Sequence, residues 1–517
     1  MTVSERRHRF AYLSSLVREI NLEAQSEDLE YFDSVPEVSA LFLLAGTSTE
    51  PHEPLFPNMT RLSVTTSVLG ELELIQLLGH SPLQDLLLCI YRTDTQLEIN
   101  DHENEGEYWK SGIVACLDWV ADTIPDLRTL SLNVPSWEGD VLGMYDFCLT
   151  PTPDALVEFT ANGAFFTPGC LDRLCNAPML ENLSLDMETF PARTDSNPAL
   201  WASNDLIPTH GFLRLSNLRL HQTYSGSLAM LKRIAGPLHT IRLRLPPEDE
   251  QGEEELEELA IALSSFSGTL TQLEIHIGKL KSETIPHPHS WKTFAPLLAC
   301  NKMQRVSLKI YAATSRSTAI FQIQDVDLCQ IASCWPQLQH LVLSWPSNPT
   351  PAAPLSAPSG YEVTVQGVVD LFRGCSALRR LQIPQISFKM GALSPATTRA
   401  ASVQKVPVKQ TAIVSLQTCD LSEEAQLHEV GTWLARNAPK LTFRPYSSHP
   451  YWDDEEEGSA SEALTHLRKQ LDSLNLARWT VAQLKRLHRG ITDDVVALHD
   501  LSPPPHTPGL SPLLPSV

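Results

Sequence analysis

The side chains with the most evident chemical potential are basic residues and histidines that recur beside a leucine pattern. In segments of the form L-x-x-L-x-L, the leucines point to one side of a strand, and the residues next to the last two leucines point to the other. Arginine binds carboxylates and phosphates through paired hydrogen bonds. The sequence therefore predicts a surface for an acidic or phosphorylated protein segment, formed by Arg219, His221, Arg242, Arg244, His276, Arg305, Lys309, His340 and Arg380.

Two interpretations of this basic surface remain open. Its side chains could form ion pairs with acids from loops at the rim of the fold and serve only solubility. Alternatively, they could face a partner and select it by its negative charge. Both interpretations are consistent with the spacing.

The chain lacks the motifs of common enzyme sites. It contains no glycine-rich phosphate-binding loop, no G-x-S-x-G and no H-E-x-x-H. Its carboxylates show no spacing that singles out an acid and base pair. His287 and His289 would need a third ligand to hold a metal ion. We therefore expect no enzymatic activity, no catalytic residue, no cofactor and no metal.

One helix and one strand, in residues 326–343, form the plan on which most of the chain is built. Leu328 and Ile331 recur at helical spacing, and Pro336 ends the helix. Three leucines then form the strand pattern: Leu338, Leu341 and Leu343.

The same strand pattern recurs along the chain at irregular steps. Repetition of strand, crossover and parallel strand predicts an α/β leucine-rich-repeat solenoid, or horseshoe, with a parallel sheet on the concave face and helices on the convex face. Residues 93–110 are acidic and are expected to form an exposed insertion, and residues 391–409 a loop. The predicted strand patterns start at Val17, Val38, Met59, Leu83, Leu127, Leu180, Leu215, Leu238, Leu270, Met303, Leu338, Leu378 and Ala438.

Composition divides the chain into four segments. Residues 1–444 form the predicted repeat domain, and residues 445–460 an acidic linker. Residues 461–490 carry leucines at helical spacing, which predicts either a terminal cap on the last repeat or a docking helix for another protein. Residues 491–517 are Pro-rich and are predicted to be disordered.

Charge and hydropathy restrict the partners and the compartment. The formal net charge is -22, which disfavours nucleic acid and anionic membranes as partners. The N-terminus lacks an apolar signal core, and no apolar run approaches the roughly 20 residues that a membrane helix needs. The ten cysteines form no C-x-x-C pair. We expect a cytoplasmic or nuclear protein.

Two segments, Ala332 to Leu338 and Cys375 to Leu381, resemble the repeats of the fungal F-box leucine-rich-repeat proteins. The resemblance extends over roughly residues 10–444. It implies that the repeats recruit a substrate, while an N-terminal F-box would dock on the Skp1-type adaptor of an SCF (cullin-RING) ubiquitin ligase. No Leu-Pro-x-Glu box precedes Phe10, so a Skp1-type adaptor is expected only if an F-box exists upstream.

Together, these features predict a non-enzymatic protein-recognition module, related to the substrate-recognition subunits of SCF ubiquitin ligases. A scaffold unrelated to ubiquitin is an alternative. A GTPase-activating protein that uses a loop arginine is an alternative of another class.

Overall fold

The computed structural model describes residues 3–23, 54–66, 72, 75, 78, 81–90, 102–133, 154–162, 174–186, 211–246, 252–278, 280, 289–311, 321–345, 363–388, 411–419, 424–445, 465 and 468–481. They belong to two compact units, Met1–Asp249 and Glu250–Val517. No helix in these ranges is both long and apolar enough to cross a membrane.

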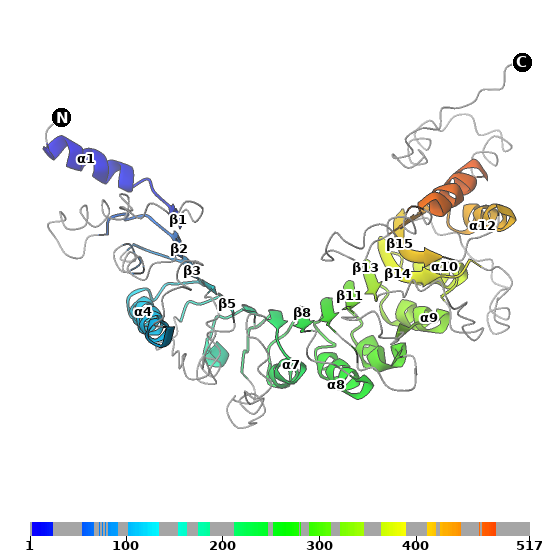
Figure 1. Ribbon diagram of the computed structural model, residues 1–517, viewed down its shortest axis with the longest axis horizontal. Helices are drawn as coiled ribbons and strands as arrows, with labels where there is room; N and C mark the ends of the chain where they lie inside the picture. Colours follow the sequence, from blue (N-terminus) through cyan, green and yellow to red (C-terminus); the bar gives the residue numbers. More distant parts are fainter. Residues whose placement is uncertain are drawn as a thin grey trace, which may run out of the picture. The chain divides into compact units, whose positions relative to one another are not determined.

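The first unit is a parallel sheet whose strands follow the chain in order (Figure 1). Every pairing between consecutive strands of this unit is parallel. Its helices are α1 (Val3–Ser14), α4 (His102–Thr123) and α7 (Tyr224–Leu231). Its strands are β1 (Glu19–Glu23), β2 (Arg61–Thr66), β3 (Asp85–Ile90), β4 (Thr129–Asn133), β5 (Glu158–Asn162), β6 (Asn182–Asp186), β7 (Asn217–His221) and β8 (Thr240–Leu245).

The second unit repeats this plan, and α9 and α10 lie on one side of β13 and β14 (Figure 1). Its helices are α8 (Glu253–Ser264), the 3-10 helix η5 (Trp291–Ala299), α9 (Asp325–Cys334), α10 (Val365–Gly374) and α12 (Glu424–Asn437). Its sheet contains β9 (Gln272–Ile277), β11 (Arg305–Ile310), β13 (His340–Ser344), β14 (Arg380–Ile386), β15 (Ala412–Cys419) and β16 (Leu441–Pro445). A separate pair joins β10 (His289–Ser290) to β12 (Phe321–Gln322).

The segment α9–β13 shows why these residues form these elements. The backbone N–H of Gln324 donates to the Asp327 carboxylate over 2.8 Å, which caps the first turn of α9. The helix ends before Pro336, with Trp335 as its C-cap. Five apolar residues of this segment are completely buried and form the core between helix and strand: Leu328, Ile331, Leu338, Leu341 and Leu343.

A recurring backbone contact fixes the register of neighbouring strands. The carbonyl of Gln304, just before β11, accepts the N–H groups of Gln339 (2.7 Å) and His340 (3.1 Å). The carbonyl of Gln339 in turn accepts the N–H groups of Arg379 (2.8 Å) and Arg380 (3.2 Å). Each strand therefore starts level with the one before it, and equivalent positions of successive repeats lie side by side.

The α/β class and the parallel pairing are confirmed, but four described strands were not predicted: β5, β15 and the short pair β10 and β12. β5 was missed because Phe159 and Ala161 take the places of leucines in its pattern, although both are buried. β15 was missed because its pattern is denser, with Ala412, Val414 and Leu416 buried on alternate positions. The sequence pattern identified β8 and β11, where Ile241 and Val306 take the place of leucine, so it tolerates some apolar replacements but missed those in β5 and β15.

The acidic stretch 93–110 is not an insertion throughout, because α4 begins at His102. Acidic side chains stabilise the first turns of a helix through its dipole, so the acidic composition is compatible with a helix start. The strand predicted from Val38, the loop predicted at 391–409, residues 446–460 of the acidic linker and the tail 491–517 lie outside the described residues.

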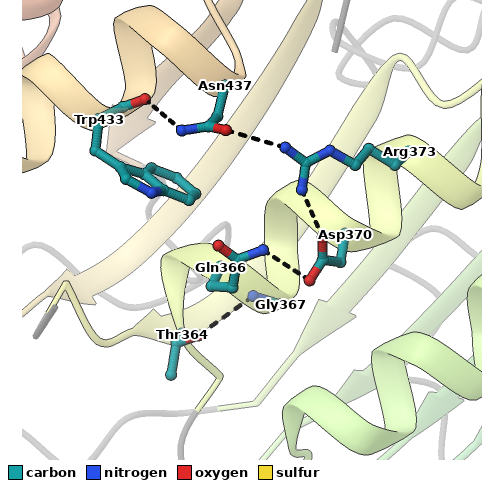
Figure 2. A network of polar contacts seen from close by, with 7 residues as sticks. All are labelled: Thr364, Gln366, Gly367, Asp370, Arg373, Trp433 and Asn437. Carbon is teal, nitrogen blue, oxygen red and sulfur yellow. Dashed lines mark hydrogen bonds and ion pairs between the residues drawn. The ribbon is translucent and has the colours of Figure 1, made fainter. Parts of the chain in front are cut away.

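A network of polar contacts joins α10 to α12 (Figure 2). Arg373 lies between the two helices and donates to Asp370 over 2.7 Å and to Asn437 over 3.2 Å. Gln366 donates to the second carboxylate oxygen of Asp370 over 2.7 Å. These hydrogen bonds hold α10 against α12, so we interpret the network as a structural contact between the two helices.

A C-terminal helix, residues 468–481, covers the last strand of the second unit. The Asn475 amide nitrogen donates to the Phe443 carbonyl over 2.8 Å, and the Phe443 N–H donates to the Asn475 oxygen over 3.2 Å. The side chain thus pairs with the edge of β16 as a neighbouring strand would. Gly431 in α12 leaves room for Ala477, because an added Cβ would lie 3.0 Å from the Ala477 Cβ. These contacts agree with the interpretation of this helix as a terminal cap.

We expect Asn475→Leu to lower the free energy of unfolding by about 1–3 kcal/mol, because it leaves the buried N–H and carbonyl of Phe443 unpaired. Urea denaturation gives this difference, and hydrogen exchange should show faster exchange at the Phe443 amide. Leu476→Ala is the matched control on the same helix. Leu476 is 50% exposed, so its loss should change stability little. Equal stability of the Asn475 variant and the parent protein would contradict the cap.

Candidate functional site

All the predicted basic and histidine residues lie on described strands, but in two groups. In the first unit, Arg219 of β7 lies opposite Arg242 of β8, and His221 lies opposite Arg244. In the second unit, the register places Arg305, His340 and Arg380 side by side on β11, β13 and β14. Lys309 of β11 lies opposite His276 of β9.

In the first unit, the histidine already has an acidic partner from its own sheet. The Nδ1 atom of His221 lies 2.8 Å from the carboxylate of Asp186, its register neighbour on β6. The His221 side chain is only 4% exposed. Two further polar residues continue this row, because Asn162 donates to Asn133 over 3.0 Å. Polar contacts therefore join neighbouring strands along this row, and His221 takes part in them as a buried side chain.

The pair His276 and Lys309 in the second unit is also neutralised. The Glu274 carboxylate lies 2.8 Å from His276 Nε2 and 3.8 Å from Lys309 Nζ. The His276 ring also makes an edge contact with Tyr311, with ring centroids 5.8 Å apart. The acids that pair with His221, His276 and Lys309 lie on the same or the adjacent strand of the sheet rather than in rim loops.

The second unit also carries a basic strip on β11, β13 and β14, which we define as Arg305, His340, Arg379 and Arg380. Among the residues that the structure describes, no carboxylate forms an ion pair with any of the four. Arg380 donates to the Gln382 side chain over 3.4 Å, which holds it over the sheet. Because neighbouring strands lie about 4.8 Å apart, Arg305 and Arg380 flank His340 at roughly 5 Å on each side. The strip is a positive row in a chain of net charge -22.

The surroundings of His340 confirm the sign of the field on this strip. Partial burial lowers the pKa of His340, and the positive charges of Arg305, Arg380 and Arg379 lower this pKa further. Each arginine therefore lies close enough to oppose a further positive charge. The imidazole is neutral near pH 7, and an anion bound here would favour its protonation.

We expect His340 to make stability depend on pH. Its folded pKa lies below the ordinary value of 6.5, so the unfolded chain binds more protons. The contribution of His340 to the free energy of unfolding is therefore fully present above pH 6.5 and is lost as the pH falls through the folded pKa. His340→Gln should lose this part of the slope, measured by urea denaturation from pH 8 to pH 5. Identical slopes for variant and parent would contradict the depressed pKa.

Arg379 is the one residue of the strip that the repeat pattern did not identify. It immediately precedes β14, so it falls outside the alternation of core and surface positions from which the others were predicted. The only signal was its position next to Arg380. Its backbone N–H donates to the Gln339 carbonyl and so helps to fix the register of β13 and β14. Its exposed side chain adds to the positive charge around His340.

The described residues contain no group of three or more histidine, cysteine or acidic side chains that could hold a metal ion. His287 lies outside them. No protein-family model matches the chain, and no curated protein matches it.

Proposed function

We propose that the protein is a non-enzymatic recognition module, built as a leucine-rich-repeat solenoid, that binds an acidic or phosphorylated segment of a partner protein on the basic strip. The observation that carries this proposal is the row Arg305, His340 and Arg380, with Arg379 beside it and no described carboxylate paired with it. Buried leucines at Leu338, Leu341 and Leu343 support the repeat architecture.

Physical chemistry supports an anionic partner. Bringing several arginines together around one histidine raises the electrostatic free energy of the unbound protein, and a bound carboxylate or phosphate offsets this repulsion. Arginine can bind a carboxylate or a phosphate through two parallel hydrogen bonds. The exposed strip also attracts such a segment at a distance, in contrast to the negative charge of the rest of the chain.

Fluorescence anisotropy with a labelled, glutamate-rich peptide tests this function. The full chain should bind this peptide, should ignore a lysine-rich peptide of the same length, and should bind more weakly as salt is added. Equal binding of both peptides, or of neither, would contradict the proposal.

We further propose that the module recruits substrates for an SCF-type ubiquitin ligase, and that it acts in the cytoplasm or nucleus. The resemblance of residues 332–338 and 375–381 to F-box repeat proteins supports this role. Co-purification of the product of the full transcript with a Skp1-type adaptor is the test. Failure to co-purify would instead favour a scaffold that uses the same basic strip without a link to ubiquitin.

A further inference from the structure

A pocket of about 560 Å³ opens in the second unit where β13, β14 and β15 begin. It is lined by Gln339, Ser376, Ala377, Leu378, Arg379 and Thr411. These residues come from the turns just before the three strands. The pocket therefore lies at one edge of the sheet, next to the basic strip.

The lining offers hydrogen-bond donors and one positive charge. Gln339 carries an amide, Ser376 and Thr411 carry hydroxyl groups, and Arg379 carries a guanidinium. Within the described parts of the chain, neither hydroxyl and no nitrogen of the guanidinium has a hydrogen-bond partner, and no acidic residue lines the pocket. Such a site fits an anion with several oxygen atoms.

Arg379 connects the pocket to the strip. Its side chain lines the pocket, and its charge also acts on His340 in the row of β11, β13 and β14. Arg380, the next residue, lies in that row. A segment bound on the strip therefore lies next to the pocket.

We propose that this pocket receives a phosphorylated serine or threonine side chain of the acidic segment that binds the basic strip. This inference rests on the proposed function and specifies its ligand. A phosphate ester carries a charge of about -1.5 to -2 at pH 7 and three acceptor oxygens, which match one guanidinium and two hydroxyl donors. A glutamate carboxylate has two oxygens and a single charge, and it leaves donors unused. The volume accommodates the whole phosphorylated residue as well as its phosphate group.

The test uses two labelled peptides of the same acidic sequence, one with a central phosphoserine and one with glutamate in its place. The full chain should bind the phosphopeptide roughly tenfold or more tightly, because the phosphate carries more negative charge than the carboxylate and one more acceptor oxygen for the pocket donors. Ser376→Ala with Thr411→Ala should remove this preference and leave the affinity for the glutamate peptide within about threefold, because neither residue belongs to the basic strip. Arg379→Ala should also remove the preference, but it should weaken binding of both peptides, because Arg379 belongs to the strip as well as to the pocket. Arg436→Ala is the matched control, since it removes an exposed arginine from α12 and should preserve the preference.

The outcomes separate this inference from the function on which it rests. Equal affinity for both peptides, with binding that depends on Arg305 and Arg380, would overturn the pocket and leave the acidic-segment function intact. Binding of neither peptide would overturn both. Thermal unfolding of Arg379→Ala should match the parent, because the side chain is exposed and the variant keeps its backbone N–H bond to Gln339. If this variant unfolds early, the Ser376→Ala and Thr411→Ala double variant alone decides the test, and an unchanged phosphate preference there would overturn the inference.

Discussion

Replacing both Arg305 and Arg380 with glutamate should abolish binding of the acidic peptide, with a loss of at least about a hundredfold in affinity. Each charge-assisted hydrogen bond contributes roughly 1.5–3 kcal/mol, and tenfold in affinity corresponds to about 1.4 kcal/mol. The two substitutions remove such bonds on both sides of His340 and replace them with repulsion. Fluorescence anisotropy at low and at physiological salt measures the change.

A matched double variant in the first unit separates the strip from the effect of net charge. Arg219→Glu with Arg242→Glu makes the same change in total charge on β7 and β8, which pair with each other. We expect this variant to retain most of the binding, because the adjacent row already holds the Asp186 carboxylate. Arg305 and Arg380 are exposed, so the first double variant should unfold at nearly the parent temperature. Unaltered peptide binding by that folded variant would contradict the basic strip.

Replacing Trp335 with alanine should lower the free energy of unfolding by about 3–5 kcal/mol, the largest change expected from a single substitution. Its side chain is completely buried, and its ring lies 6.2 Å from that of Trp291 in an edge contact. The Trp335 indole N–H donates to the Leu297 carbonyl over 3.3 Å, and its backbone carbonyl accepts the Cys375 thiol. Trp335 therefore links η5, the end of α9 and the end of α10.

Trp335→Phe is the control for this prediction, because it keeps the aromatic contact and loses only the indole donor and part of the volume. We expect it to cost less than half of the alanine change. Urea denaturation followed by circular dichroism gives both values. A loss below about 1 kcal/mol for the alanine variant would show that Trp335 does not join the helices of the second unit.

The leucine pattern predicted the positions of most strands because a buried parallel strand requires apolar residues at fixed alternate sites. The same reasoning placed Arg305, His340 and Arg380 at equivalent positions, and the register confirms that they are neighbours. It failed for β5, where Phe159 and Ala161 fill the core in place of leucine. Core positions tolerate any apolar side chain that fits, so a pattern written in leucines is narrower than the physical requirement.

The acidic partners of His221, His276 and Lys309 could not be predicted from spacing. Glu274 lies at a surface position like any other, yet its carboxylate reaches both His276 and Lys309. The direction in which such a side chain points depends on the residues of the neighbouring strand as well as on those of its own strand. The pocket beside Arg379 could not be predicted either, because its lining comes from three turns that are far apart in the sequence.

Photo-crosslinking of the acidic peptide to the full chain tests the central claim most directly. A peptide with a benzophenone at its centre should label residues of β11, β13 and β14, and mass spectrometry of the digest would locate the adducts. We expect the adducts near Arg305, His340 and Arg380, and we expect excess unlabelled peptide to suppress them. Adducts confined to β7 and β8 or to the helices, with none on these three strands, would contradict the assignment of the binding surface.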